Sequence, residues 1–139
     1  MSIATDLLQQ HILTLVDDPQ RWASLIADDI EWELPYAPAI GHPLRLSGRA
    51  KVEAHVGWFR DAVRDFHFRD VRIIEGANPE IAVAEMRAEG IIKATGRTYG
   101  QEYVVFLLAA GNRIRHLREY FDPVRAAQAL DAPILALQA

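Results

Sequence analysis

The first part of the chain carries apolar residues at helical spacing. Those on one face of the expected N-terminal helix are Leu7, Leu8, Ile12, Leu15 and Val16, and Ser2 or Thr5 is a suitable residue to cap its start. Pro19 favours the start of a second, shorter helix. Residues 30–34 then alternate apolar and acidic side chains, a pattern that predicts a half-buried β-strand.

The middle of the chain contains a proline-rich loop followed by a longer helix. Three prolines and a glycine between residues 35 and 46 predict a loop of fixed shape, which we expect to lie over the mouth of a pocket. Ser47 is the expected cap of a helix that runs to Ala62. On that helix Val52, His55, Val56 and Phe59 share one face, so the pattern turns His55 toward the interior.

The second half of the chain is rich in expected strands. They lie at residues 66–74, 81–95, 98–109 and 113–122, and the glycine-containing turns between them predict consecutive antiparallel hairpins. A final short helix is expected after Pro123 and through Ala129.

This order of elements predicts an α+β fold. Helices should cover one face of a strongly curved, mostly antiparallel sheet, and the resulting cone should enclose a cavity for a small molecule. The 139 residues include no internal repeat and no linker-like stretch. We therefore expect one domain that spans residues 1–139.

Composition and charge argue against several classes of function. The net charge is −4 and lysine and arginine do not cluster, which speaks against a nucleic-acid partner. The absence of cysteine excludes disulfides, thiolate metal ligands and a cysteine nucleophile. The N-terminal segment lacks a basic start, and Asp6 and two glutamines interrupt its apolar residues. We expect neither a signal peptide nor a membrane span, and a cytoplasmic location.

Glu119 is the strongest candidate for chemistry. In the expected last strand it alternates with Leu117 and Phe121, so a carboxyl group is flanked by apolar neighbours on one face. If that face lines the cavity, burial would raise the pKa of Glu119 and make it a general acid or base near neutral pH. The alternative is a glutamate at the rim that pairs with one of the many arginines.

The other candidates have equally plain structural alternatives. A neutral imidazole at His55 could relay a proton or orient a carbonyl group, but a lone buried histidine is more often a core residue. Glu33 could meet the phenol of Tyr36 at the pocket mouth, although its alternation with Trp32 and Leu34 points it to solvent. Two polar ladders leave alternatives open: the one at residues 85–89 could be a buried polar network but is more often a solvated or dimer-facing surface. The one at residues 99–103 suits either a ligand or a subunit contact.

Several well-known motifs are missing from the sequence. There is no phosphate-binding loop, no dinucleotide glycine pattern, no nucleophile elbow and no recognisable metal spacing among His55, His116 and Glu119. We therefore expect no metal and no cofactor. If the protein is an enzyme, the absence of these motifs leaves a cofactor-free acid/base reaction.

Five short segments together resemble a known family. They read Ser-Gly-Arg at 47–49, Glu-Ala-His-Val-Gly-Trp at 53–58, Asp-Val-Arg-Ile at 70–73, Gly-Asn-Arg-Ile-Arg at 111–115 and Arg-Glu-Tyr-Phe-Asp-Pro at 118–123. In this order they resemble the SnoaL-like branch of the nuclear transport factor 2-like and ketosteroid isomerase-like superfamily, and within it the phenazine biosynthesis protein A/B type. The resemblance spans most of the chain.

The resemblance implies a cone-shaped, cystatin-like fold and a role for two residues. In the phenazine proteins a glutamate of the last strand and a histidine of the long helix serve an acid/base condensation, and these roles would fall on Glu119 and His55. The loop at 34–38 departs from the phenazine proteins. Leu34 and Val104 stand roughly where ketosteroid isomerase has its two aspartates, which argues against steroid isomerisation by such a pair.

Two functions therefore remain open. The first is a cofactor-free isomerase, cyclase or condensing enzyme for a small carbonyl-containing or cyclic metabolite, with Glu119 and His55 as catalytic residues. The second is a non-catalytic ligand-binding or dimerisation module of the same fold. The residues expected to contact a ligand are Glu33, Tyr36, Trp58, Phe59, Tyr103, Leu117 and Phe121. The resemblance also implies a homodimer through the outer sheet face, to which the ladders at 85–89 and 99–103 could contribute.

Overall fold

The computed structural model describes residues 2–135, and the ends of the expected domain, residue 1 and residues 136–139, lie outside the described part. The N-terminal half contains α1 (Ile3–Thr14), α2 (Pro19–Leu25), β1 (Ile26–Glu33), the 3-10 helix η1 (Ala37–Ile40), β2 (Arg45–Ser47) and α3 (Arg49–Ala62). The C-terminal half contains β3 (Val63–Glu75), β4 (Ile81–Ile92), β5 (Thr98–Ala110), β6 (Arg113–Phe121) and α4 (Pro123–Leu130). Within residues 2–135, no helix combines the length and the hydropathy needed to traverse a bilayer.

All six described strands belong to one sheet with the order β2-β1-β6-β5-β4-β3. Strands β3 to β6 form the consecutive antiparallel hairpins that the turn signals predicted, whereas β1 pairs with β6 in parallel. The α+β class and the curved, mostly antiparallel sheet predicted from the sequence are thus confirmed.

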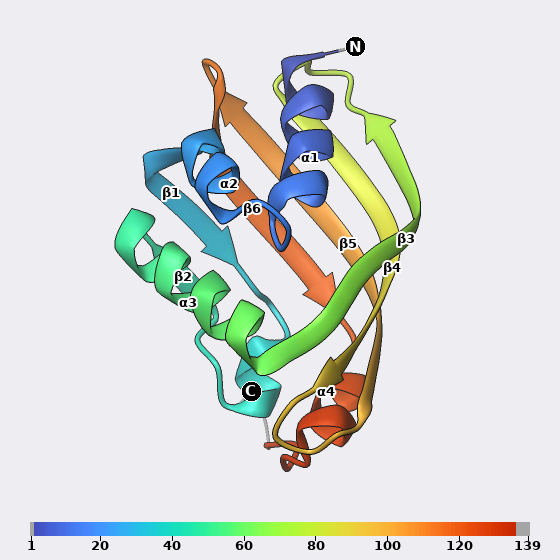
Figure 1. The fold of residues 1–139 in the computed structure, drawn as a ribbon. Helices are drawn as coiled ribbons and strands as arrows, with labels where there is room; N and C mark the ends of the chain where they lie inside the picture. Colours follow the sequence, from blue (N-terminus) through green and yellow to red (C-terminus); the bar gives the residue numbers. More distant parts are fainter. Residues whose placement is uncertain (1, 136–139) are drawn as a thin grey trace.

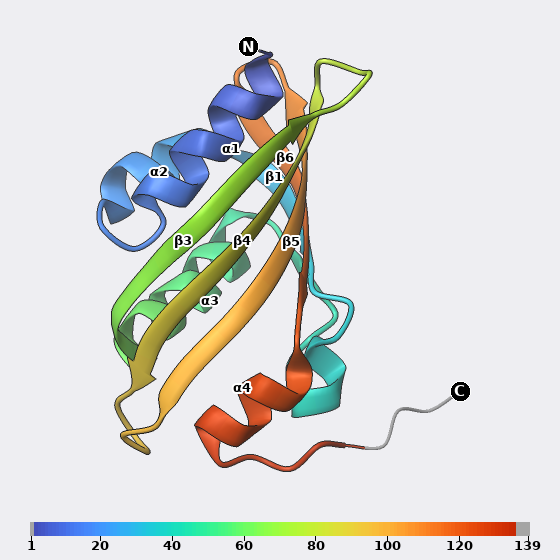
Figure 2. The same cartoon turned by 90° about the vertical axis from the view of Figure 1, so that its right-hand side faces the viewer.

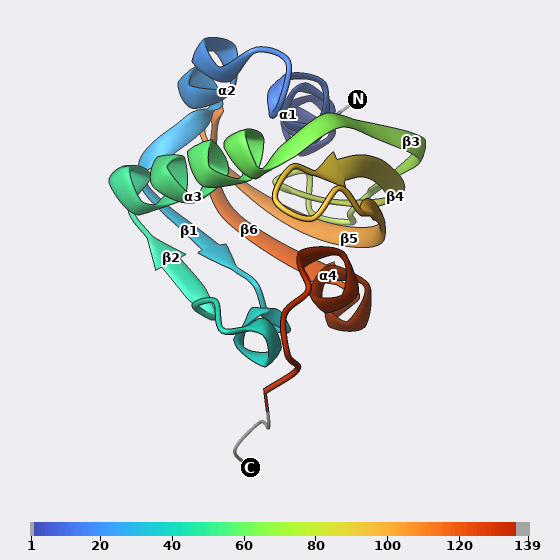
Figure 3. The ribbon, with the colours of Figure 1, turned by 60° about the horizontal axis from the view of Figure 1, so that its bottom comes forward.

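Helices α1, α2 and α3 cover one face of the sheet, and the opposite face carries no helix in the described chain (Figure 2). Viewed from the end that holds α4, the sheet curves around α3 (Figure 3). The core therefore lies on the concave side, and large fully buried side chains from the helices and the strands meet there, among them Leu8, Trp22, Ile30, Val52, Leu107 and Leu117.

Some boundaries differ from the expectations for physical reasons. Ser2 caps α1, where its hydroxyl accepts a hydrogen bond from the Thr5 N–H at 3.1 Å. Ser47, expected to cap α3, instead ends β2 and donates to Glu31 at 2.8 Å. The residue before α3 is Gly48, whose φ of 88° lies in a region that favours glycine.

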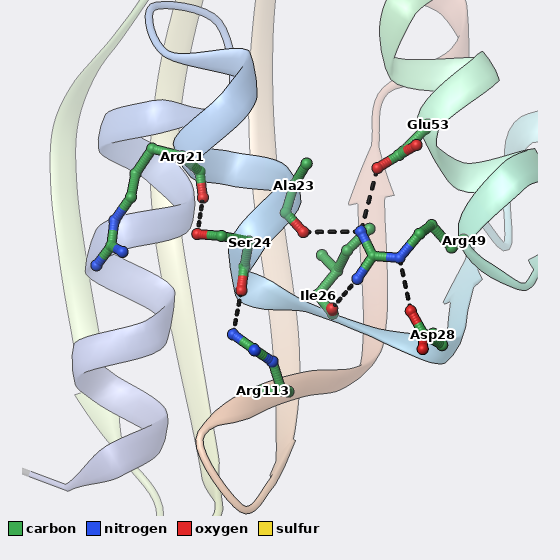
Figure 4. Close-up of polar contacts among 8 residues, drawn as sticks. All are labelled: Arg21, Ala23, Ser24, Ile26, Asp28, Arg49, Glu53 and Arg113. Atoms are coloured by element: carbon green, nitrogen blue, oxygen red, sulfur yellow. Dashed lines mark hydrogen bonds and ion pairs between the residues drawn. The ribbon is translucent and has the colours of Figure 1, made fainter.

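The junction between α2, β1 and α3 is held by one arginine. Arg49, the first residue of α3, donates to the carbonyl oxygens of Ala23 and Ile26 and to the carboxylates of Asp28 and Glu53 (Figure 4). The Arg49 bonds to Ala23 and Asp28 are both 2.8 Å long. The end of α2, which has free carbonyl groups, is thereby tied to the start of the helix that carries His55.

Candidate active site

Glu119 lies in the wall of a cavity on the concave side of the sheet. On β6 it alternates with Leu117 and Phe121, as the sequence predicted, and it lies opposite Val105 of β5. A register shift in the β5–β6 pairing follows Ile114, so both Ile114 and Leu117 are buried although they are three positions apart and a regular strand would place them on opposite faces. This irregularity sets the face on which Glu119 lies.

The cavity has a volume of about 80 Å³ and a mainly apolar wall. The residues that line it come from the loop after β1, from α3, from the sheet and from α4: Leu34, Ala37, Ile40, His42, His55, Trp58, Phe59, Ala62, Val63, Ile92, Tyr99, Tyr103, Glu119, Phe121, Ala126 and Leu130. This volume is below the range of about 300–1,000 Å³ that is usual for ligand sites. A ligand must therefore be small or displace side chains at the mouth, where Trp58 is 43% exposed.

Burial raises the pKa of Glu119 to about 8, and desolvation is the cause. Within residues 2–135 the carboxyl group has no hydrogen-bond partner and no ion pair that would offset this cost. By area the residue is partly exposed, because its side chain borders the cavity, and the mainly apolar wall around it still disfavours the charged form of the carboxyl group. Glu119 therefore exchanges a proton near neutral pH.

Helix α3 brings His55, Trp58 and Phe59 to the same cavity. The ring of His55 lies 6.0 Å from that of Trp32 and 5.8 Å from that of Trp58, as centroid distances. Burial lowers the pKa of His55, and the nearby His42 lowers it further. His55 is therefore a neutral imidazole at pH 7.

His42 is a lining residue that the sequence did not identify. Its ring centroid lies 6.5 Å from that of His55 and 5.0 Å from that of Trp58. It follows Gly41, whose φ of 81° ends η1 and turns the chain back over the cavity. Such loops lack the periodicity that would have revealed the direction of His42.

Tyr99, Gln101 and Tyr103 of β5 also point into the interior and are buried. The two hydroxyl groups lie 3.0 Å apart, and both tyrosines line the cavity. Burial raises the pKa of Tyr99 to about 12 and that of Tyr103 well above its usual value. The expectation that the 99–103 ladder contributes to a subunit contact on the outer face is therefore wrong, because these side chains lie on the other face.

Three residues expected to contact a ligand lie away from the cavity. Glu33 is on the opposite face, where its carboxylate lies 2.9 Å from Nε2 of His116 and 3.5 Å from Nη2 of Arg45. Tyr36 is 47% exposed and packs against Tyr120 on that face. Leu117 is fully buried in the core beneath the cavity. The strand alternation explains the position of Glu33, since Trp32 and Leu34 occupy the inner face.

The remaining expected site residues come together. Glu119, His55, Trp58, Phe59, Tyr103 and Phe121 all line this one cavity. Among the described residues, no group of three or more histidines and carboxylates is arranged to hold a metal ion. The cavity thus combines an apolar wall with a lone carboxyl group, two imidazoles and two phenols, all of which can donate or accept protons.

Comparison of the sequence with known families gives one clear match. Residues 14–117 match the model of the SnoaL-like domain. An uncharacterized PhzA/B-like protein of Pseudomonas aeruginosa is 30% identical over 122 residues, which make up 86% of this chain and 85% of that protein. The sequence match therefore extends over β1 to β5 and most of β6.

Comparison of the structure gives the same fold. A candidate isomerase of Bacillus subtilis matches with a TM-score of 0.85 at 24% identity, over 96% of both chains. A candidate polyketide cyclase of Xanthomonas campestris matches with a TM-score of 0.79 at 20% identity, over 92% of this chain and 96% of that one. Further matches are described as ketosteroid isomerase-like or NTF2-like, and one of them was crystallised with trimethylamine. At these identities the matches show the fold alone.

Proposed function

Because the chain belongs to the SnoaL-like domain family, we propose that it is an enzyme that isomerises, cyclises or condenses a small carbonyl-containing or cyclic metabolite by acid/base chemistry. The observation that carries the proposal is Glu119, an unpaired carboxyl group with a raised pKa in the wall of an apolar cavity. Unpaired buried carboxyl groups reduce stability and are typical of functional sites.

Glu119 is the residue that moves the proton. As a carboxylate in this apolar wall it is a stronger base than an ordinary glutamate, and it takes a proton from the carbon next to a ligand carbonyl group. The electrons of the broken C–H bond move to the carbonyl oxygen, which becomes an enolate. Glu119 is then a neutral acid, and it returns the proton to another carbon or to oxygen, which completes an isomerisation or prepares a ring closure.

His55 and Tyr103 act on the ligand oxygen. The phenol of Tyr103 donates a hydrogen bond to the charge that develops there, and neutral His55 orients or polarises the carbonyl group. Such donors stabilise the enolate more than the ketone, and they do so most strongly where water is excluded.

The lack of arginine and lysine among the described lining residues favours a ligand without a carboxylate or phosphate group. The chain has thirteen arginines and two lysines, yet none of them is among the described residues that line the cavity. An anionic ligand would lose its hydration in this wall with no cation to offset the cost, and it would also be repelled by the carboxylate form of Glu119. This favours a neutral carbonyl compound.

Exchange of the α-protons of acetophenone in D₂O, followed by proton NMR, tests the role of Glu119. The protein should accelerate the exchange, and the rate should rise with pH through about 8, because the carboxylate form is the base. Glu119→Gln keeps the shape but removes the base, so it should lower the accelerated rate by about a hundredfold or more.

Glu102→Gln is the matched control, since Glu102 lies on the same sheet but on its outer, exposed face, where it pairs with Arg87. An unchanged rate in Glu119→Gln would remove Glu119 from the mechanism. Acetophenone binding without any accelerated exchange in the wild-type protein would instead support a ligand-binding module of this fold.

A further inference from the structure

The side-chain amide of Gln101 has one possible orientation. Its oxygen accepts hydrogen bonds from the backbone N–H of Asp122 at 2.8 Å and of Glu102 at 3.0 Å. Its nitrogen donates to the carbonyl oxygen of Asp122 at 2.9 Å and to the hydroxyl of Tyr99 at 3.2 Å. A flipped amide would point its NH₂ group at two N–H donors, so the orientation is fixed by the backbone.

This orientation determines what the two tyrosines do. Gln101 offers only an N–H to Tyr99, so the Tyr99 oxygen accepts there and its proton is free for another partner. The pair of phenols holds two hydroxyl protons, but the contact between them at 3.0 Å uses only one. Whichever tyrosine donates in that contact, one O–H of the pair is left over among the described residues.

The left-over O–H belongs to residues that line the cavity. Aromatic neighbours hold both rings: Phe66 stacks on Tyr99 with centroids 6.4 Å apart, and Phe68 contacts the ring of Tyr103 by its edge at 6.2 Å. Glu119 is a diagonal neighbour of Tyr103 across the β5–β6 pair, since Tyr103 lies opposite Phe121 and Glu119 opposite Val105. The donor and the carboxyl group therefore face the same ligand.

We infer that Tyr99 and Tyr103 form a donor site for one oxygen atom of the ligand, and that Gln101 is the positioning residue that orients this pair. The inference rests on the proposed function in taking this cavity as the ligand site. Both phenols remain neutral at working pH because burial raises their pKa values. They therefore act as hydrogen-bond donors. A site of this kind discriminates against an analogue without the acceptor oxygen, because its buried O–H then stays unpaired.

Two ligand pairs test this inference without any turnover. Each pair consists of a ketone and the alkene that replaces its C=O by C=CH₂: cyclopentanone with methylenecyclopentane, and acetophenone with α-methylstyrene. Dissociation constants are measured by ligand-observed NMR, and the carbonyl stretch of bound acetophenone is measured by infrared spectroscopy. The wild-type protein should bind each ketone about five- to tenfold more tightly than its alkene. The carbonyl stretch of bound acetophenone should lie at a lower frequency than in water.

Three variants separate positioning from mere structural support. The double variant Tyr99→Phe/Tyr103→Phe removes both hydroxyls and should reduce the preference for the ketone to about twofold or less, whereas either single variant still leaves one O–H free for the ligand. Gln101→Leu should do the same and should move the carbonyl stretch back toward its value in water, while the affinity for the alkenes changes little. Tyr120→Phe is the control, because Tyr120 packs on the outer face against Tyr36 and Phe106.

The result that would overturn the inference is equal binding of ketone and alkene in the wild-type protein, or no binding of either ketone. Equal weakening of ketone and alkene by Gln101→Leu would assign Gln101 a structural role only. The ketone preference of the wild-type protein is measured without turnover, so failure of the proton-transfer proposal and failure of this inference give different results.

Discussion

At the scale of single residues, His11 is a buried imidazole that serves as a structural hydrogen-bond acceptor and does not line the cavity. His11 lies on α1, is 1% exposed, and accepts a hydrogen bond from Nε1 of Trp22 at 2.9 Å. Its ring centroid lies 6.3 Å from that of Trp22 and 5.9 Å from that of Trp32. Burial lowers the pKa of His11 to about 4. His11 therefore joins α1 to α2 only while it is neutral.

This coupling makes the stability of the protein depend on pH. Between pH 6.5 and about 4 the unfolded chain binds a proton at His11 and the folded chain does not, so the free energy of unfolding falls as the pH falls. From pH 7.5 to pH 5 the loss due to His11 should be about 2 kcal/mol. Urea unfolding of wild type and His11→Gln at both pH values measures it.

The variant keeps an acceptor for Trp22 and should lose this part of the pH dependence. His67→Gln is the control, because His67 is exposed on β3. Identical pH dependence in wild type and His11→Gln would show that His11 titrates normally in the folded protein.

At the scale of elements, Arg49 determines where α3 begins relative to α2 and β1. Its guanidinium group is planar and makes bonds to two carbonyl oxygens and two carboxylates at once. A lysine ammonium cannot reproduce this fork. Arg113 adds a bond to the Ser24 carbonyl oxygen in the same junction. The position of His55 and Trp58 in the cavity wall thus depends on a contact two to three turns away on the same helix.

Loss of the Arg49 contacts should destabilise the protein measurably. Arg49→Gln leaves the carbonyl oxygens of Ala23 and Ile26 without their charged donor, so the free energy of unfolding should fall by about 1.5–3 kcal/mol. Arg49→Lys should recover little of this loss. Urea unfolding at pH 7.5 is the measurement. Arg125→Gln is the control, since in the described part of the chain Arg125 pairs with the nearby Asp122 at the exposed start of α4. Equal effects at Arg49 and Arg125 would contradict the structural role of Arg49.

The elements that could be predicted from the sequence are those with a clear period. The helical spacing in α1 and α3 and the turns between β3 and β6 sufficed to place Glu119 and His55 on inner faces. Irregular segments were not predictable. Strand β1 begins at Ile26 with an irregular register up to Glu31, and β2 lies inside the proline-rich loop. His42 comes from that loop, and its direction depends on tertiary contacts that no local pattern encodes.

The residues expected to contact a ligand could also be predicted only in part. Trp58, Phe59, Tyr103 and Phe121 reach the cavity, whereas Leu117, on the same face as Glu119, is covered by the core. Alternation along a strand gives the face of a residue but not its depth, because depth depends on which helix packs above it. The role of Gln101 could not be predicted either, because it depends on hydrogen bonds to Asp122, the residue directly after β6.

At the scale of the whole molecule, charge is divided between the two faces of the sheet. The outer face carries ion pairs such as Arg69 with Glu89 and Arg87 with Glu102, while the cavity on the inner face holds Glu119 without a cation. The homodimer expected from the sequence stays a prediction. Because burial raises the pKa of Glu119 from 4.5 to about 8, the free energy of unfolding falls as the pH rises from about 4.5 to about 8, and this cost is consistent with a functional role.

Carbon-13 NMR of the side-chain carboxyl groups measures the protonation of Glu119 directly. The Glu119 signal is assigned by its absence from the spectrum of Glu119→Gln and is then followed from pH 4 to pH 10. A midpoint near 8 is the predicted result, because the apolar cavity disfavours the carboxylate. A midpoint near 4.5, the ordinary value for glutamate, would mean that water or a cation reaches the carboxyl group, and it would contradict the proposed acid/base role of Glu119.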